Sequence, residues 1–204
     1  MKRVSFIANI GAEKNSIPNG VNIKNRHILR FLKENKNFEV KLIDTDEWKK
    51  RFIYLFFEIM IQSFKSERII LSINTKSAYQ IIKFLNILNL DRKLIYIVVG
   101  GSLPEEIKKG NLKSKYYNNI ARIFVQTEKM LNVLKSIGLN NVERLVNSKY
   151  FTDITVDYDR PINIPIKAYY LGRIHPDKGI NLLLKALDKV NSNTTQITID
   201  FFGP

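Results

Sequence analysis

Residues 68–101 read RIILSINTKSAYQIIKFLNILNLDRKLIYIVVGG, and this stretch decides the fold. Arg68–Ile73 and Leu94–Val99 are short apolar runs rich in β-branched residues, which predict buried strands. The segment between them has apolar side chains near helical spacing, and Thr75 is a candidate cap for that helix. A strand, a helix and a strand of this length predict a βαβ unit, in which the two strands are parallel.

The same alternation extends in both directions from this unit. Four more apolar runs predict strands: Val4–Ile10, Phe38–Ile43, Ile120–Val125 and Val142–Val146. Three segments between them have helical periodicity: Val21–Asn35, Glu47–Phe64 and Glu128–Gly138. This order predicts an α/β fold with a mostly parallel sheet that is covered on both faces. Ligands bind beyond the carboxyl ends of such strands, so we expect the Gly11–Gly20 and Gly100–Pro104 loops on one rim.

The pattern is interrupted near residue 160. Asp157–Pro165 reads DYDRPINIP and predicts a linker, because it contains two prolines and has no periodicity. We therefore expect one domain at residues 1–156, a linker at 157–165, and a second domain that begins at residues 166–204. That last segment predicts a strand, a helix and a strand, at 166–171, 176–190 and 197–202. A unit of about forty residues buries too little surface to be stable alone, so it is either incomplete or packed on another polypeptide.

The composition excludes several classes of protein. The chain has no cysteine, which excludes disulfides, thiolate–metal sites and a thiol nucleophile. The apolar run near the N-terminus is shorter than a signal peptide requires, and we expect a strand there. The longest apolar stretch, Phe52–Phe64, is interrupted by Glu58 and is too short to span a bilayer. The net charge of +14 favours an anionic partner, unless it only reflects a generally lysine-rich composition.

The segment with the clearest chemical pattern is Leu171–Ile180, which reads LGRIHPDKGI. Arg173 and Lys178 flank the predicted start of a helix, and Pro176 suits its first turn. Free N–H groups and the positive end of the helix dipole lie at such a start, where an arginine fork and a lysine would suit a diphosphate. Gly179 would allow close approach of the ligand. The alternative is an ordinary surface turn with two solvated cations.

This motif is similar to the opening of the donor-binding domain in family 4 glycosyltransferases. The matching pattern is Gly172-Arg173-x-x-Pro176-x-Lys178-Gly179, followed by an apolar helix, and the closing DFFGP of residues 200–204 resembles the next strand and turn. Residues 96–105, 124–128 and 138–142 resemble the acceptor-side domain of a bacterial branch that builds capsular or other surface polysaccharide. The resemblance implies a GT-B fold: an N-terminal Rossmann-like parallel-sheet domain and the first βαβ unit of a second Rossmann-like domain, the donor-binding one.

The resemblance also implies roles for individual residues. Arg173 and Lys178 would hold the diphosphate of a nucleotide-sugar donor and stabilise the leaving nucleotide. Gly20 matches the glycine loop near the donor phosphates, although the family often has two glycines there. Gly100, Gly101 and Ser102 fall where the acceptor should lie. The donor would lie between the two domains, and no cofactor or metal is expected.

Two features of the family are absent from this sequence. The pair of glutamates that holds the sugar and ribose does not occur before the chain ends at Pro204. The family often has a histidine on the acceptor-side rim, whereas here His27 falls inside a predicted helix as a packing residue, and His175 falls in the Arg173–Lys178 turn. No catalytic base is therefore assigned. The family resemblance alone implies hexosyl transfer with retention of configuration.

A basic stretch with tyrosines suggests a membrane surface. Its residues are Lys108, Lys109, Lys113, Lys115, Tyr116 and Tyr117. Cations near anionic lipid and tyrosines at the interface favour peripheral docking at the inner face of the membrane, where a cytoplasmic transferase would meet a lipid-linked glycan acceptor. Trp48 with Lys49-Lys50-Arg51 forms a second basic aromatic patch. The alternative for both is a solvated charged surface.

Three hypotheses follow from the sequence. The first is a glycosyltransferase that moves a sugar from a nucleotide sugar to a surface polysaccharide. The second is a catalytically incomplete fragment, which depends on a separate C-terminal half as its partner. The third is a basic nucleotide- or nucleic-acid-binding module, but the sequence has no RNA- or DNA-binding motif, so nucleic acid is not expected as a partner.

Overall fold

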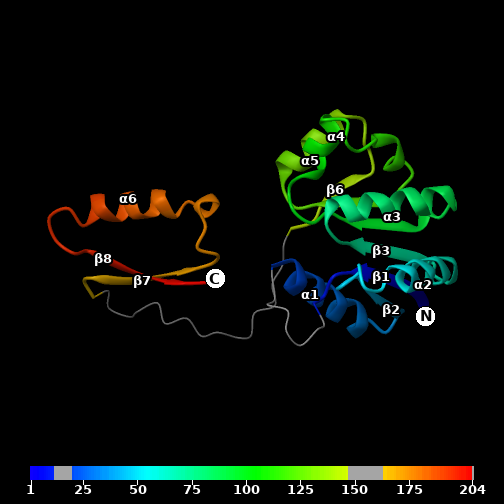
Figure 1. Cartoon of the computed structure of the whole chain (residues 1–204), viewed down its shortest axis with the longest axis horizontal. Coiled ribbons are helices and arrows are strands. Elements are labelled where there is room, and N and C mark those ends of the chain that lie inside the picture. The colour runs from blue at the N-terminus through cyan, green and yellow to red at the C-terminus, as the bar shows by residue number, and fades with distance from the viewer. Residues whose placement is uncertain (12–19, 147–162, 204) are drawn as a thin grey trace. The chain divides into compact units, whose positions relative to one another are not determined.

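The computed structural model describes residues 1–11, 20–146 and 163–203 (Figure 1). The chain divides into two compact units, Met1–Phe151 and Thr152–Pro204, and each is described by itself. In the part that the structure describes, no helix is long and apolar enough to cross a membrane.

The first unit is built on a six-stranded, fully parallel sheet. Its strands are β1 (Lys2–Ala8), β2 (Phe38–Asp44), β3 (Arg68–Ser72), β4 (Leu94–Ile97), β5 (Arg122–Val125) and β6 (Val142–Arg144). They lie in the order β2-β1-β3-β4-β5-β6. The predicted α/β fold with a parallel sheet is confirmed. The chain moves outward from β1 to β2 and then returns to the other side of β1 at β3, which makes the β1/β3 boundary a topological switch point.

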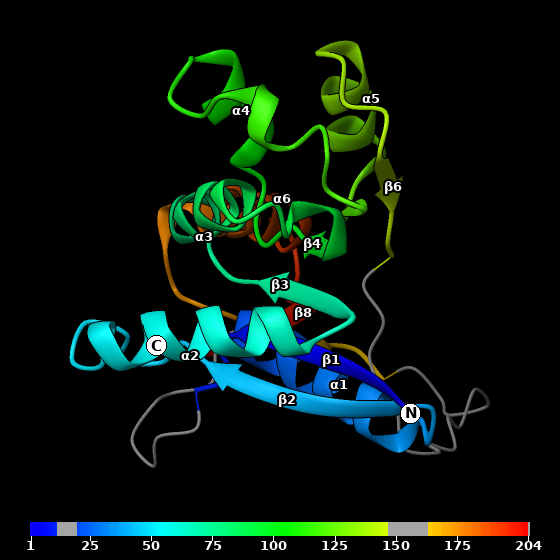
Figure 2. The same cartoon turned by 90° about the vertical axis from the view of Figure 1, so that its right-hand side faces the viewer.

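Helices cover both faces of this sheet. They are α1 (Gly20–Glu34), α2 (Phe52–Lys65), α3 (Thr75–Ile87), α4 (Leu103–Lys108) and α5 (Glu128–Ser136), with short 3-10 helices η1 (Asp91–Lys93) and η2 (Ser114–Tyr116). Alternate residues of β1 separate the two layers. Phe6 packs with Leu32 of α1, whereas Ile7 belongs to the larger core formed with α2, α3 and α5. Figure 2 shows α1 and α2 on opposite sides of β1.

Two predicted helix starts differ from the structure. The segment Glu47–Arg51 forms turns, so α2 begins at Phe52 rather than at Glu47. Glu47 has a φ of 47°, a left-handed conformation that a continuous helix does not contain. The cap of α3 is Asn74 rather than Thr75, because the Asn74 side chain accepts a hydrogen bond from the Ser77 N–H at 3.0 Å.

Tyr117 is a core residue and not a surface residue. Its side chain is fully buried, and its ring stacks on that of Tyr79 with 6.3 Å between centroids. Burial raises the pKa of the Tyr117 hydroxyl above its ordinary value, which keeps the group neutral. The prediction that Tyr117 lies at a membrane surface is therefore wrong. A tyrosine beside lysines reads the same in sequence whether its ring points outward or inward.

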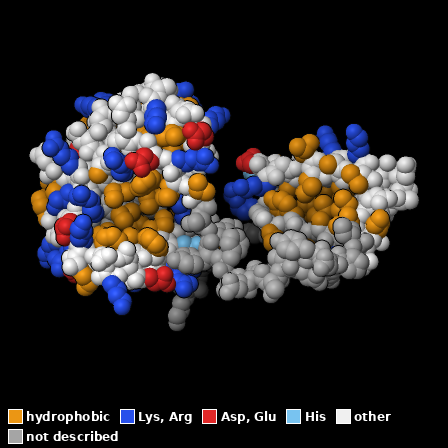
Figure 3. Space-filling view, turned by 180° about the vertical axis from the view of Figure 1, so that it is seen from behind, with side chains coloured by type: hydrophobic (Ala, Val, Ile, Leu, Met, Phe, Trp, Pro, Cys, Tyr) orange, Lys and Arg blue, Asp and Glu red, His pale blue; other side chains and the backbone are white. Residues whose placement is uncertain are grey.

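The second unit is a two-stranded parallel sheet with one helix. Its elements are β7 (Ile166–Leu171), the 3-10 helix η3 (Pro176–Lys178), α6 (Ile180–Val190) and β8 (Ile197–Phe202). No residue of these elements is buried, and Leu171 and Leu182 are 77% and 74% exposed. Figure 3 shows hydrophobic side chains gathered on the surface of this unit. The described residues of this unit therefore do not enclose a core of their own.

Candidate functional site

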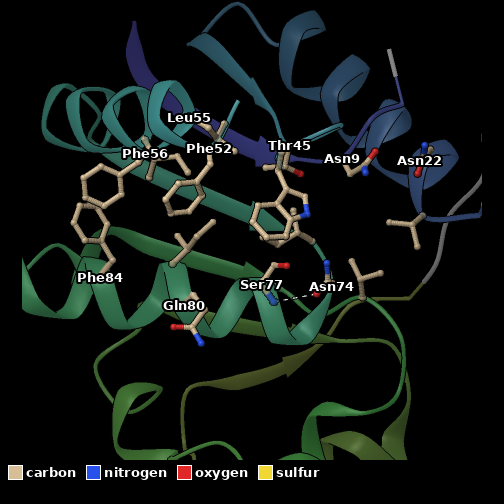
Figure 4. A pocket seen from close by; sticks show the side chains of 16 residues that line it. Asn9, Asn22, Thr45, Phe52, Leu55, Phe56, Asn74, Ser77, Gln80 and Phe84 are labelled. Atoms are coloured by element: carbon tan, nitrogen blue, oxygen red, sulfur yellow. Dashed lines mark hydrogen bonds between the residues drawn. The ribbon is translucent and has the colours of Figure 1, made fainter. Parts of the chain in front are cut away.

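A cavity of about 630 Å³ opens at the carboxyl edge of the six-stranded sheet (Figure 4). Four of its lining residues lie just past strand ends: Asn9, Thr45 and Ile73 directly follow β1, β2 and β3, and Val99 lies two residues after β4. Asn9 and Ile73 thus place the cavity at the switch point between β1 and β3, where ligands bind in open parallel sheets. A concave, largely apolar site with a few polar groups is the usual form of a small-molecule site.

One wall of the cavity is aromatic and aliphatic. It is formed by Trp48, Phe52, Leu55, Phe56 and Ile59 from α2 and the turn before it, and by Ile81 and Phe84 from α3. The rings of Phe56 and Phe84 lie 4.7 Å apart between centroids and join the two helices. Figure 4 shows this pair at one end of the cavity, with Asn9, Asn22 and Asn74 toward the other. The site therefore suits a ligand with an apolar part and a polar part.

The polar end is held in place by a buried asparagine that does not itself line the cavity. Asn25 of α1 is fully buried, and its amide donates to the backbone oxygens of Asn9 and Ser72 at 2.9 and 3.0 Å. The Ser72 hydroxyl in turn donates to the Asn25 side-chain oxygen at 2.6 Å. These bonds tie α1 to the ends of β1 and β3. Sequence reasoning missed Asn25, because its only signal is a polar residue on the inner face of a predicted helix.

Arg26 fixes the loop that follows β1. Its guanidinium donates to the backbone oxygens of Ile10 and Gly11 at 2.8 and 2.6 Å. Residues 12–19 of the predicted Gly11–Gly20 loop lie outside the described residues, and only Gly11 and Gly20 are described. Gly20, the predicted donor-loop residue, is exposed and is the first residue of α1. The neighbouring residues Val21 and Asn22 line the cavity.

Lys24 is a half-buried cation on the same helix. Its amino group is shielded from solvent and has no hydrogen-bond partner among the described residues. Burial lowers the pKa of Lys24 below the ordinary lysine value of 10.5. Sequence analysis did not single out this residue. His27, by contrast, is half-buried on α1, where a packing residue was predicted.

The predicted acceptor loop follows Val99, the cavity residue just past β4. Gly100, Gly101 and Ser102 come directly after Val99, are exposed, and lead into α4. The Ser102 hydroxyl donates to that of Thr75 at 3.1 Å, which connects the loop to the start of α3. The loop therefore adjoins the cavity edge but contributes none of its lining residues. Sequence analysis missed the aromatic wall, which forms only when α2 and α3 pack side by side.

The predicted diphosphate residues lie on one turn of the second unit. Arg173 follows β7, Lys178 ends η3, and both side chains are exposed. Neither cation has an ion-pair partner among the described residues of that unit. Between them, the Nδ1 atom of His175 accepts a hydrogen bond from the Asp177 N–H at 3.3 Å. Both cations are therefore free to bind an anion.

The helix after this turn begins later than predicted. Pro176–Lys178 form a 3-10 turn, Gly179 has a φ of 73°, and α6 starts at Ile180. The left-handed Gly179 separates the two helical segments and has no side chain to cap the N–H groups of the first α6 turn. Lys178 thus stands directly beside a helix N-terminus, where anions are stabilised.

The Lys108–Lys115 surface is only partly as predicted. Lys108, Lys109, Lys113 and Lys115 are exposed, whereas Tyr116 is half-buried. The Lys115 amino group lies 5.2 Å from the centroid of the Tyr116 ring. The stretch therefore presents cations but no exposed aromatic ring. Among the described residues, no cluster of three His, Asp or Glu side chains is arranged to hold a metal ion.

Comparisons with known proteins give a match at the level of fold. No family model matches the chain, and no curated protein matches its sequence. Anabaena Alr3699/HepE in complex with UDP-glucose superposes with a TM-score of 0.61 at 13% identity, over 98% of this chain and 60% of HepE. HepE with UDP and glucose gives a TM-score of 0.63 at 14% identity, over 98% and 61%.

A third structure, S. aureus TarM with UDP and glycan ligands, covers 60% of this chain and 30% of TarM at 17% identity, but its TM-score of 0.38 is too low to bear on the fold. The chain spans about three fifths of the length of HepE. The chain therefore has the α/β fold of GT-B glycosyltransferases, with a six-stranded Rossmann-like domain followed by a βαβ unit.

Proposed function

We propose that this chain transfers a sugar from a nucleotide-sugar donor to a glycan acceptor. The observation that carries the proposal is the cavity at the β1/β3 switch point of a fold shared with HepE, which was solved with UDP-glucose. A fold alone does not specify chemistry, so the proposal also depends on the free cations of the second unit.

In this proposal, Arg173 and Lys178 bind the donor diphosphate. Both are exposed beside the uncapped N-terminus of α6, so an anion there would meet two positive side chains and free N–H groups. Negative charge grows on the diphosphate as the sugar departs. Fixed cations therefore stabilise the transition state more than the ground state. Gly20, the first residue of α1, is kept in the proposal as a donor-loop residue, and no metal is needed in this scheme.

The acceptor is proposed to enter the cavity of the first unit. Its aromatic wall suits an apolar group, and its asparagine-lined end suits sugar hydroxyls. We propose a lipid-linked glycan of surface or capsular polysaccharide biosynthesis, taken at the inner face of the membrane by a cytoplasmic, peripheral protein. The transferred sugar is proposed to be a hexose, with retention of configuration. The hexose and its retention rest on the resemblance of residues 171–186 to a donor-binding domain, and the acceptor class rests on the resemblance of residues 96–105, 124–128 and 138–142 to an acceptor-side domain.

Saturation-transfer NMR on the 204-residue chain tests the donor assignment. UDP-glucose should give signals from both the uridine and the glucose, and excess UDP should compete. Radiolabelled transfer to a polyprenyl-linked acceptor then tests the reaction itself. A chain that binds neither UDP-glucose nor any other nucleotide sugar would contradict the proposal.

A second proposal is favoured by one observation on the second unit. None of the described residues of β7, α6 and β8 is buried. A folded unit with this much apolar surface is normally covered. We therefore also propose that the chain works only with further polypeptide covering this unit, such as a separate C-terminal half. A monodisperse 204-residue monomer that transfers sugar unaided would rule this out.

A further inference from the structure

Ten of the fourteen residues of helix α2 are apolar, and most of these apolar side chains face solvent. Leu55, Ile59 and Ser63 form its buried side. Seven other large apolar side chains of the helix are between 39% and 72% exposed: Phe52, Ile53, Tyr54, Phe56, Phe57, Ile61 and Phe64. Trp48, just before the helix, is 45% exposed. An exposed apolar surface of this extent is normally covered, either by protein or by lipid.

The charges around α2 are arranged for an anionic partner. Lys49 and Arg51 precede the helix and Lys65 ends it, whereas Lys50 is paired with Glu47 at 2.7 Å. The Arg51 guanidinium lies 5.3 Å from the centroid of the Tyr54 ring, so cation and aromatic face the same solvent. The single acidic residue of the helix, Glu58, is 14% exposed and lies 3.8 Å from the Lys41 amino group. The exposed apolar surface is therefore bordered by cations at both ends.

We propose that the outer face of α2 docks on an anionic lipid bilayer. This α2 face is defined by Trp48, Ile53, Tyr54, Phe57, Ile61 and Phe64. Tryptophan and tyrosine prefer the interface between headgroups and acyl chains, and phenylalanine and isoleucine enter the acyl region. Lysine and arginine at the helix ends bind anionic headgroups. A purely apolar partner protein would offer no complementary charge to Lys49, Arg51 and Lys65.

This surface replaces the Lys108–Lys115 stretch as the docking site. That stretch presents four exposed lysines, but Tyr116 is half-buried and Tyr117 is buried, so no ring there can enter a bilayer. Electrostatic attraction without insertion is weak and easily screened by salt. The α2 face supplies both insertion and charge.

Docking through α2 also brings the cavity to the lipid. Phe52 and Phe56 line the cavity and are themselves 58% and 39% exposed, so the same helix forms part of the aromatic wall and part of the outer surface. A lipid-linked acceptor could therefore pass from the bilayer to the cavity along α2. This consequence rests on the proposed function. The docking test needs no sugar donor, so a failure of docking and a failure of sugar transfer are distinguished.

The test uses the full chain and Trp48, which is its single tryptophan. Vesicles of phosphatidylcholine mixed with phosphatidylglycerol should bind the chain in co-sedimentation, and lipids brominated on the acyl chain should quench Trp48 fluorescence. Vesicles of phosphatidylcholine alone should bind much less, and added salt should weaken binding. The double variant I53S/F57S should lose roughly tenfold or more in vesicle affinity. Neither of these residues lines the cavity.

The matched control is Phe31→Ser. Phe31 is 59% exposed on α1, which covers the other face of the sheet, and its removal should leave vesicle binding unchanged. Circular dichroism of all variants checks that the fold is retained. Vesicle binding by I53S/F57S equal to that of the unmodified chain would overturn the proposal. Self-association that I53S/F57S abolishes, with no binding to anionic vesicles, would also overturn it and assign the face to a second copy of the chain.

Discussion

Asn25 on α1 and Ser72 at the end of β3 are joined by two hydrogen bonds, of 3.0 Å from the Asn25 amide to the Ser72 backbone oxygen and of 2.6 Å from the Ser72 hydroxyl to the Asn25 side-chain oxygen. Both residues are fully buried. The pair fixes the start of α1 against the switch point of the sheet, where the cavity opens. A polar pair in this position holds the rim of the site rather than binding ligand itself.

Asn25→Ala should therefore destabilise the first unit. The change leaves the Ser72 hydroxyl and two backbone oxygens without a partner in a buried place, at a cost of about 2–3 kcal/mol. The free energy of unfolding in urea measures this. Asn118→Ala, at an exposed asparagine, is the control and should change stability by less than about 0.5 kcal/mol. Equal stability of the two variants would show that the pair does not hold α1.

Gln80→Trp should block the cavity without unfolding the chain. Gln80 lines the cavity from α3 but is exposed, so a larger side chain fills open space rather than displacing the core. We expect the dissociation constant of farnesyl phosphate, a short lipid phosphate, to rise roughly tenfold, which corresponds to about 1.4 kcal/mol. Lys76→Trp on the same helix, outside the cavity, should bind as the unmodified chain does. If both variants bind equally, the cavity does not hold the lipid.

Gly179→Ala should loosen the start of α6. The φ of 73° at Gly179 lies in the left-handed region, which costs a residue with a Cβ about 1–2 kcal/mol. Hydrogen exchange of the α6 amides should become faster, and donor binding should weaken because Lys178 shifts. Gly101→Ala is the control for hydrogen exchange, because Gly101 does not have a positive φ and the space around its Cβ position is open. Unchanged exchange in α6 would mean that the turn tolerates a side chain.

Lys24→Met should stabilise the chain at neutral pH. Burial lowers the pKa of Lys24 in the folded state, so the unfolded state binds more protons in the range below 10.5. Stability of the unmodified chain should therefore rise as the pH increases through that range. The advantage of Lys24→Met should be largest at neutral pH and should shrink as the pH approaches 10.5. Urea midpoints measure this, with exposed Lys36→Met as control; an advantage that is constant with pH would contradict the explanation.

The sequence predicted the sheet well because its strands are nearly continuous apolar runs. Each predicted strand overlaps an observed one, and β7 and β8 match to the residue. Helix starts were predicted less well, since they depend on single backbone conformations. Glu47 and Gly179 are left-handed, and each delays the helix that the apolar pattern would begin earlier. The periodicity of apolar residues indicates that a segment is helical. It does not show at which residue the first hydrogen-bonded turn of the helix begins.

The site was only partly visible in the sequence. Arg173 and Lys178 could be proposed from the sequence because a short motif holds both cations within one turn, and their role stays a prediction. The aromatic wall was not, because Phe56 and Phe84 come from different helices and meet only after folding. The exposure of α2 was missed for a related reason: Phe57 and Leu55 are both apolar in sequence, and only packing shows that one is exposed and the other buried.

The central claim is that Arg173 and Lys178 bind the diphosphate of a nucleotide sugar. Its most direct test is the dissociation constant of UDP-glucose for Arg173→Ala and Lys178→Ala, measured by isothermal titration calorimetry. Arg92→Ala and Lys185→Ala, at exposed cations elsewhere, are the matched controls. We expect each site variant to weaken binding roughly tenfold to a hundredfold, as the loss of a charge-assisted hydrogen bond requires, with the controls unchanged. Unchanged affinity in both site variants would contradict the claim.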